Sequence, residues 1–302
     1  MIYTITLNPA LDYTIGIRNL KINEINLSET EHISPGGKGI NVSTILKRLE
    51  IDSVVLGFIS GFTGDEIKRI IENEQIKTDF IKLEGGNSRI NVKILEENSE
   101  TAINSQGPLV GQKDILKLYQ KLESLKKDDF LVLSGSIPKG IQEDIYKTIC
   151  EKIQDKNIKI IVDSTRDLLL NTLKYEPFLI KPNHHELGEI FNTKISNKEQ
   201  AIKYAKKLQE KGAKNVLVSM GEKGSVLIDE SGKVYQKEAI QNKKIINTVG
   251  AGDSMVAGFL AGYLKYANYE KALNLGIASA TATVNNIYLG EKDEIIEYFK
   301  RI

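Results

Sequence analysis

The chain has 302 residues, of which 41% are hydrophobic and 27% are charged, values typical of a globular protein with a large core. Lys and Arg together number 41, and Asp and Glu number 40, so the net charge favours neither nucleic acid nor an anionic membrane as a partner. The single cysteine, Cys150, excludes an internal disulfide framework and a multi-cysteine metal site. We expect it to be a buried small hydrophobic residue.

Apolar runs alternate with helical patterns through most of the chain. After an opening strand at 1–8, short buried strands are predicted at 54–59, 130–134, 158–163, 178–181 and 215–220. Helices are predicted at 39–49, 65–74, 114–125, 141–154, 183–191 and 198–211. This order predicts an α/β fold with a doubly wound, mostly parallel sheet flanked by helices. Ligands of such folds bind beyond the carboxyl ends of the strands.

Two segments, 13–34 and 89–105, break this alternation. Both are polar and alternate like strands, which predicts a small antiparallel β lid beside the main sheet. No repeat or Pro-rich linker divides the chain, so we expect one domain over 1–302. An exposed lid edge can pair with a second copy, which makes a homodimer an expectation.

The expected location is the cytoplasm. The first eight residues lack the basic start and apolar run of a signal peptide, and no stretch reaches the ~18 apolar residues of a membrane span. One cysteine in the whole chain fits a reducing compartment.

A glycine-rich turn precedes a helical pattern at 255–266. Backbone N–H groups of Gly250, Ala251 and Gly252 can point at one spot near the helix start, which favours a phosphate or an oxyanion. Asp253, which follows, suits a base that accepts a proton during phosphoryl transfer. Alternatively, Asp253 caps the helix and the glycines merely turn the chain. The spacing matches neither a dinucleotide fingerprint nor a P-loop.

Near the N-terminus, the segment 36–41 (Gly-Gly-Lys-Gly-Ile-Asn) runs into an apolar-periodic helix. Its glycines allow close approach to a ligand, Lys38 brings a positive charge, and Asn41 can donate and accept hydrogen bonds. Asp12 can accept from two hydroxyl groups, and Arg89 suits forked binding of phosphate. Simpler interpretations also stay open: the segment 36–41 is a loop that caps a helix, Asp12 is a turn residue, and Arg89 is a solvated surface charge.

Together, the segments 36–41 and 247–253 resemble the two signatures of the ribokinase family, in its phosphofructokinase-B branch. Four further motifs, at 8–12, 88–94, 133–138 and 179–186, are similar to those of the phosphosugar kinases of this branch. The resemblance runs over essentially the whole chain. It implies a ribokinase-like fold and a kinase that uses ATP and Mg²⁺.

The resemblance also implies roles for single residues. Asp253 matches the catalytic base, and the backbone of Gly250, Ala251 and Gly252 matches the groups that stabilise the transferring phosphoryl group. Residues that match sugar-hydroxyl positions are Asp12, Gly37 and Asn41. Lys38 and Arg89 match cations that hold a phosphate already present on the sugar.

The nucleotide side follows from the same resemblance. Residues that match the ATP site are Lys181, Asn183, Ser219, Gly221, Gly224 and Asn285. Glu186 matches a residue that supports Mg²⁺ through water. His184 and His185 are interpreted as solvated helix residues.

These matches predict phosphoryl transfer from ATP to the primary hydroxyl of D-fructose 1-phosphate, which gives fructose 1,6-bisphosphate. A tagatose-6-phosphate kinase is the nearest rival function, since it needs the same two cations. A kinase for unphosphorylated sugars or nucleosides and a catalytically silent sensor of sugar phosphate or nucleotide also stay open.

Overall fold

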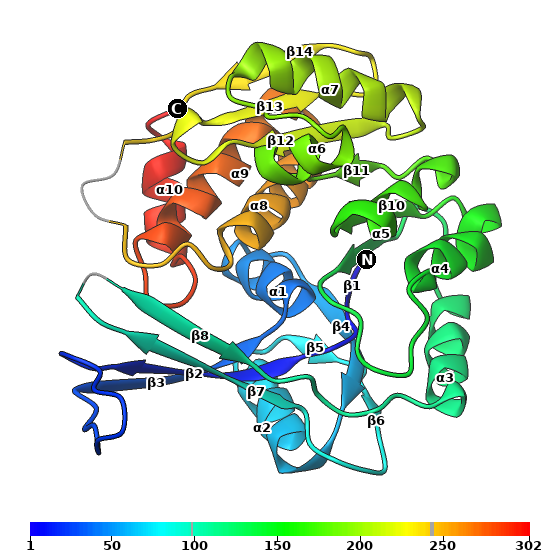
Figure 1. Cartoon of the computed structure of the whole chain (residues 1–302). Coiled ribbons are helices and arrows are strands. Elements are labelled where there is room, and N and C mark those ends of the chain that lie inside the picture. Colours follow the sequence, from blue (N-terminus) through cyan, green and yellow to red (C-terminus); the bar gives the residue numbers. More distant parts are fainter. Residues whose placement is uncertain (98, 242–244) are drawn as a thin grey trace.

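The computed structural model describes residues 1–97, 99–241 and 245–302. Its centre is a ten-stranded sheet with the order β14-β13-β12-β11-β10-β9-β1-β4-β5, in which β6 also pairs with β4 (Figure 1). The strands are β1 (Ile2–Thr6), β4 (Ser53–Ile59), β5 (Lys77–Thr78), β6 (Ile81–Lys82), β9 (Phe130–Ser134), β10 (Lys159–Asp163), β11 (Leu179–Ile180), β12 (Asn215–Ser219), β13 (Ser225–Ile228) and β14 (Val234–Lys237). Pairing is parallel from β5 to β12 and antiparallel from β12 to β14, which confirms the mostly parallel sheet.

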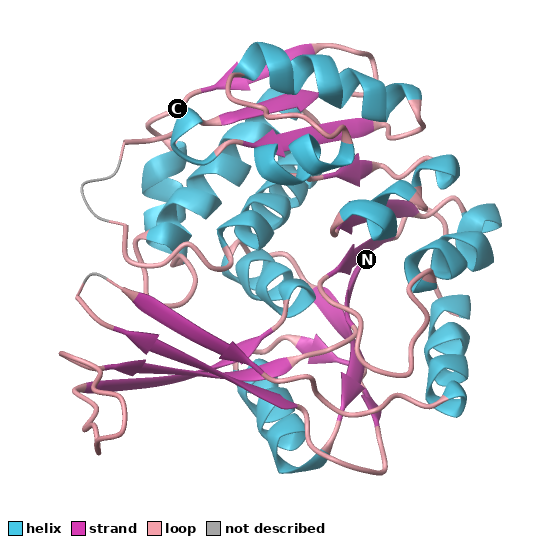
Figure 2. Cartoon of the chain, viewed as in Figure 1, coloured by secondary structure: helices cyan, strands magenta, loops and turns pink. Residues whose placement is uncertain are grey.

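Helices lie on both faces of this sheet (Figure 2). They are α1 (Lys38–Arg48), α2 (Gly61–Asn73), α3 (Gln112–Glu123), α4 (Ile145–Ile153), α5 (Arg166–Leu170), α6 (His184–Ile190), α7 (Lys198–Glu210), α8 (Ala251–Tyr266), α9 (Tyr269–Val284) and α10 (Lys292–Phe299). Alternate side chains of a strand point to opposite faces. In β9, Leu131 and Leu133 therefore join the core beneath α3, α4 and α7, while Phe130 and Val132 join the core beneath α1, α8 and α9. Cys150 is fully buried in the first of these cores, as predicted.

A separate four-stranded sheet forms the lid, which extends to the lower left in Figure 1. Its order is β3-β2-β7-β8, from β2 (Ala10–Gly16), β3 (Thr30–Gly36), β7 (Arg89–Leu95) and β8 (Glu100–Asn104). The two hairpin-like pairs are antiparallel as predicted, but β2 and β7 pair in parallel. This difference arises because α1, β4 and α2 intervene in the chain between β3 and β7.

Helices α8 and α9 pack almost in backbone contact. A methyl group on Gly258 would collide with Ser279 and Leu275, and one on Gly262 would lie 2.6 Å from the Ala272 Cα. Glycine at these two positions therefore permits the close approach of the two helices. Among the described residues, no helix is both long and apolar enough to cross a bilayer.

Candidate active site

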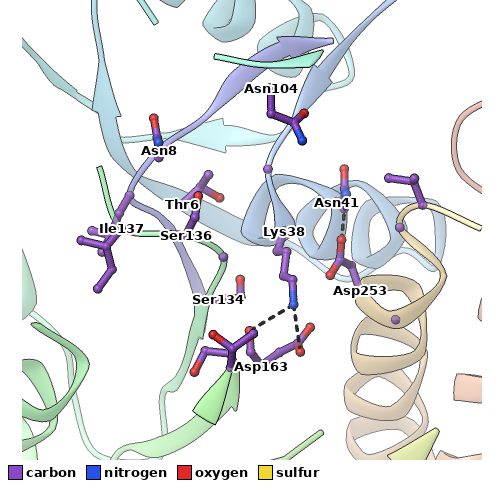
Figure 3. A pocket seen from close by; sticks show the side chains of 18 of the residues that line it. Thr6, Asn8, Lys38, Asn41, Asn104, Ser134, Ser136, Ile137, Asp163 and Asp253 are labelled. Atoms are coloured by element: carbon purple, nitrogen blue, oxygen red, sulfur yellow. Dashed lines mark hydrogen bonds and ion pairs between the residues drawn. The ribbon is translucent and has the colours of Figure 1, made fainter. Parts of the chain in front are cut away.

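A cavity of about 940 Å³, lined mostly by polar and charged residues, lies between the lid and the carboxyl ends of the central strands (Figure 3). Strand ends contribute the side chains of Thr6 from β1, Ser134 from β9, Asp163 from β10 and Ser219 from β12. Parallel strands all end at one edge of the sheet, so residues far apart in the chain meet there. The sequence predicted a ligand site at this edge.

Asp253 lies at the base of the cavity, in the third position of α8. Gly250 precedes the helix with φ 81°, and no side chain caps the helix start. The Asp253 Oδ2 atom accepts a 2.8 Å hydrogen bond from Asn41 Nδ2, and the residue is only 5% exposed. The helix-cap alternative is therefore not what the structure shows. Asp253 is a buried carboxylate that faces the cavity and is held by α1.

The pKa of Asp253 is raised to about 6, chiefly because burial disfavours its charged form. The nearby Asp163 carboxylate raises this pKa further, whereas Lys38 and the Asn41 hydrogen bond oppose the shift. A carboxylate with this pKa is mostly ionised at neutral pH and has a stronger affinity for a proton than a solvated aspartate.

The glycines of the turn allow close contacts around Asp253. A Cβ on Gly252 would lie 3.0 Å from Lys181 Nζ, and a Cβ on Gly250 would lie 2.7 Å from the Leu289 side chain. The first backbone N–H groups of a helix have no partner within the helix, so this turn can hold an anion between them and the lysine.

Two lysines converge on one buried carboxylate at the floor of the cavity. Asp163 Oδ1 lies 3.2 Å from Lys38 Nζ and 3.4 Å from Lys181 Nζ (the Lys38 contact is visible in Figure 3). Asp163 is 1% exposed, yet Lys181 and Lys38 outweigh burial and lower its pKa. The pKa of Lys38 is raised, since Asp163, Asp253 and Glu186 outweigh the effect of burial.

This arrangement gives Lys38 a partner that the sequence did not predict. Lys38 was predicted to hold the phosphate already carried by the sugar, and in the structure its ammonium is paired with Asp163 at the floor. Asp163 was not predicted at all. Its only sequence signal is a carboxylate that ends a predicted buried strand, a position where ligand sites occur in this fold class.

The lid supplies the opposite wall of the cavity. Asp12 Oδ1 accepts a 2.8 Å hydrogen bond from Asn91 Nδ2, and Arg89 Nε donates to the Asn8 carbonyl at 3.0 Å. Asp12, Gly37 and Arg89, which were predicted from the sequence, line the cavity, as do the unpredicted Asn8 and Asn91.

Many buried polar atoms of this cavity have no hydrogen-bond partner among the described residues. They are Asn8 Oδ1, Asn41 Oδ1, Asn91 Oδ1, Ser134 Oγ, Asp163 Oδ2 and Ser164 Oγ. A buried polar atom without a partner costs about 1–3 kcal/mol. Four of these six atoms are amide or carboxylate oxygens that accept hydrogen bonds, so they fit a ligand rich in hydroxyl groups.

On the nucleotide side, Asn183 and Glu186 form a capping box at the start of α6. Asn183 Oδ1 accepts from the Glu186 backbone N–H at 2.9 Å, and Glu186 Oε2 accepts from the Asn183 N–H at 2.8 Å. Asn183 therefore precedes the helix as its N-cap, whereas the sequence predicted a helix that begins at 183. Both line the cavity, together with Lys181 and Ser219.

Three predicted nucleotide residues, Gly221, Gly224 and Asn285, do not line this cavity. Gly224 has φ 81° and lies against the Lys237 carbonyl, so the turn between β12 and β13 requires a glycine there. Asn285 Nδ2 donates to the Tyr298 hydroxyl at 2.6 Å.

His184 and His185 lie in the first turn of α6 and line a second hollow, away from Asp253. Their rings are 3.9 Å apart, and the pKa of His184 is lowered by partial burial and by its neighbour. Neither residue lines the cavity described above. His185 is exposed, as predicted for a solvated helix residue, whereas His184 is half-buried and its Nδ1 is shielded from solvent.

The comparisons with known proteins agree with this geometry. The model of the pfkB family of carbohydrate kinases matches residues 6–294. The chain is 42% identical to the 1-phosphofructokinase of Bacillus subtilis over 293 residues, which cover 97% of this chain and 95% of the relative. It is 35% identical to the D-tagatose-1-phosphate kinase of Bacillus licheniformis over 296 residues, which cover 98% and 96%.

Among solved structures, phosphofructokinase-2 of Escherichia coli in complex with substrates and products superimposes with a TM-score of 0.94. The match covers 99% of this chain and 98% of that chain, at 26% identity. The cavity brings both glycine-rich segments to one buried aspartate, and the relatives match along nearly the whole chain. This chain belongs to the pfkB family of carbohydrate kinases.

Proposed function

We propose that the protein transfers the γ-phosphoryl group of ATP to the free primary hydroxyl of D-fructose 1-phosphate and so produces fructose 1,6-bisphosphate. The observation that carries this proposal is Asp253, a buried carboxylate with a pKa raised to about 6 beside the open N-terminus of α8. The name of the Bacillus subtilis relative supports the choice of substrate.

In this reaction the sugar oxygen forms a bond to the γ-phosphorus while the bond from that phosphorus to the β-phosphate oxygen breaks. Asp253 accepts the proton of the attacking hydroxyl, and Asn41 keeps its carboxylate in place. The N–H groups of the 250–252 turn, with Lys181 and Lys38, stabilise the charge of the transferring group. Closure of the lid excludes water, which is the competing acceptor.

Mg²⁺ fits the donor atoms of this cavity only together with the phosphates of ATP. The described residues hold no cluster of three or more metal-type ligands. They do offer Asp163 Oδ2, a buried oxygen without a partner, and the Glu186 carboxylate. Mg²⁺ takes few ligands from such proteins and keeps several waters, so we propose that Glu186 supports it through water. The ion would neutralise phosphate charge.

We place the ATP phosphates along the ends of β11 and β12. Lys181, Asn183 and Ser219 line that end of the cavity, next to the 250–252 turn. Gly221, Gly224 and Asn285 remain predictions for the rest of the nucleotide. A kinase that depends on ATP and carries one buried thiol suits the cytoplasm, which remains the proposed location.

D-Tagatose 1-phosphate is the second candidate substrate, because the Bacillus licheniformis relative is named for it. It differs from the rival substrate predicted from sequence, tagatose 6-phosphate, in the position of the phosphate. Tagatose and fructose are epimers at C4, so contacts to that hydroxyl, not to the phosphate, would have to distinguish them.

The deciding experiment measures ADP release with ATP and Mg²⁺ for fructose 1-phosphate, tagatose 1-phosphate, tagatose 6-phosphate, fructose 6-phosphate, fructose and ribose. We expect the highest kcat/KM for fructose 1-phosphate and its loss in Asp253→Asn. Lys82→Gln is the matched control, since Lys82 pairs with Asp65 on the surface and lies outside the cavity. A preference for unphosphorylated sugars contradicts the proposal, and turnover of no substrate favours the sensor.

We further propose a homodimer formed through the outer face of the lid. Strand register places Ile33, Tyr13, Val92 and Ile103 in one row across the four strands, opposite the face that carries Asp12. Ile33 is 53% exposed and Ile103 is 59% exposed. Light scattering of the Ile33→Asp, Ile103→Asp double variant should show a monomer where the wild type is a dimer; a monomeric wild type refutes this proposal.

A further inference from the structure

The position of Lys38 leaves the substrate's own phosphate with one predicted cation, Arg89. The Lys38 ammonium lies 3.2 Å from Asp163 at the floor, and the other acids that raise its pKa are Asp253 and Glu186. All three carboxylates line the cavity, and the proposed function assigns Asp253 as the base and Glu186 as the Mg²⁺ support. Lys38 is therefore assigned to the reacting end, and a second cation at the lid would complement Arg89.

Strand β7 of the lid carries that cation. Arg89, Asn91 and Lys93 occupy alternate positions of the strand, so their side chains share the face that lines the cavity. The Cα atoms of Arg89 and Lys93 are separated by four residues, or roughly 13 Å of strand. Long side chains can reach from both ends toward a group held above Asn91.

The neighbours of Lys93 leave room for its side chain to turn into the cavity. Its partners in the register are Thr14 on β2 and Ala102 on β8, both of which are small. Asn91 lies opposite Asp12 and Asn104, so hydroxyl-binding groups occupy the centre of the lid face between the two cations. Polar groups for the sugar are thus flanked by positive charge.

The positive charge of Lys93 also has no acidic partner among the described residues. Within residues 1–97, 99–241 and 245–302, no hydrogen bond or ion pair involves it, whereas the ammonium groups of Lys38 and Lys181 are both paired with Asp163. Glu100 also faces the cavity, but it lies opposite Leu95, two pairs further along the lid. An unpaired cation that lines a cavity attracts an anionic ligand group.

We propose that Lys93 is the second anchor of the phosphate that the substrate already carries, acting with Arg89 from the same lid strand. This proposal rests on the proposed function. It extends that function by assigning the preference for a phosphosugar to the lid. Lys38 acts on the transferring phosphoryl group instead. An unphosphorylated ketohexose would then contact the same floor residues but would form no ion pair with Arg89 or Lys93.

The test compares Lys93→Gln with the wild type on fructose 1-phosphate and on fructose. For the phosphosugar, KM should rise about 10- to 100-fold, as expected for the loss of a charge-assisted contact, with kcat within about twofold. The kcat/KM for fructose and the KM for ATP should not change. Lys93→Arg should restore most of the affinity, because it keeps the charge.

Lys38→Gln provides the contrast, since it should lower kcat on both sugars. Lys82→Gln is the control for loss of a surface lysine, and melting temperatures show whether each variant is folded. The inference is overturned if Lys93→Gln leaves the KM for fructose 1-phosphate unchanged, or if it lowers turnover of fructose and fructose 1-phosphate equally. If the wild type itself shows no preference for a phosphosugar, the proposed function fails, independently of Lys93.

Discussion

The floor and the lid of the cavity are built in opposite ways. On the floor, Asp163, Lys181 and Asp253 are at most 5% exposed and lie on strands or helices fixed by two cores. In the lid, every residue of β8 is exposed, and the sheet has one face toward the cavity and one away from it. The proposed base and its partners thus lie on the buried part, whereas the lid combines a buried Asn91 with an exposed edge strand.

This contrast separates two kinds of kinetic effect. A change on the floor alters groups that act on the transition state, so it should lower kcat. A change in the lid alters contacts that hold the sugar throughout the reaction, so it should raise KM while kcat changes little. The predictions below test this division, starting with the largest effect.

Asp253→Asn should lower kcat about 10²- to 10⁴-fold, because an amide cannot accept the proton. The same variant should be more stable than the wild type at pH 8, by about 1–3 kcal/mol, since it removes a buried charge whose pKa is raised. Steady-state kinetics and urea unfolding measure the two effects. A variant that is inactive and also less stable would contradict this account of the floor.

Asn41→Ala should lower kcat about tenfold at neutral pH, because Asp253 loses the hydrogen bond that orients it. That bond also lowers the pKa of Asp253, so its loss should move the acid limb of the pH–rate profile to higher pH. An acid limb that stays in place would show that Asn41 does not act on the base.

In the wild type, kcat should fall about tenfold per pH unit below about pH 6, as Asp253 becomes protonated. The contribution of Asp253 to stability has the opposite sign. Its folded pKa is above the ordinary value of 3.8, so the cost of burying its charge is present above about pH 6 and disappears as the pH falls toward 4. Profiles of kcat and of unfolding free energy, with Asp253→Asn as reference, should show both trends.

Asn91→Ala should have the smallest effect, a rise in sugar KM of about three- to tenfold with kcat nearly unchanged. Asn91 orients Asp12, and its own buried Oδ1 has no partner among the described residues. A fall in kcat as large as that of Asn41→Ala would remove the distinction between lid and floor.

The sequence predicted the central strands well because a parallel strand buried on both faces is a continuous apolar run. The predicted strand 130–134 coincides with β9, and β1, β4, β10, β11 and β12 differ from their predictions by one or two residues at their ends, whereas β5, β6, β13 and β14 were not predicted. The parallel pairing of β2 with β7 was not predicted, because pairing between segments about eighty residues apart leaves no local pattern.

The same limit applied to the site residues, because contacts between distant positions leave no local pattern in the sequence. Asp253 and Asn41 were predicted as separate groups, but the hydrogen bond between them joins positions 212 residues apart. Asp163 was missed because its importance comes from Lys38 and Lys181, which approach it only in the folded chain. The sequence likewise could not show that Lys38 pairs with Asp163, because the direction of a lysine side chain is set by its partner in the folded chain.

The glycine contacts between α8 and α9 bear on how the protein can move. Gly258 and Gly262 leave no space for even one methyl group between the two helices, so sliding or rotation of α8 against α9 would meet steric resistance. We therefore expect Asp253 and its turn to keep their position when ligands bind. Closure of the site would then be a movement of the lid sheet toward this turn.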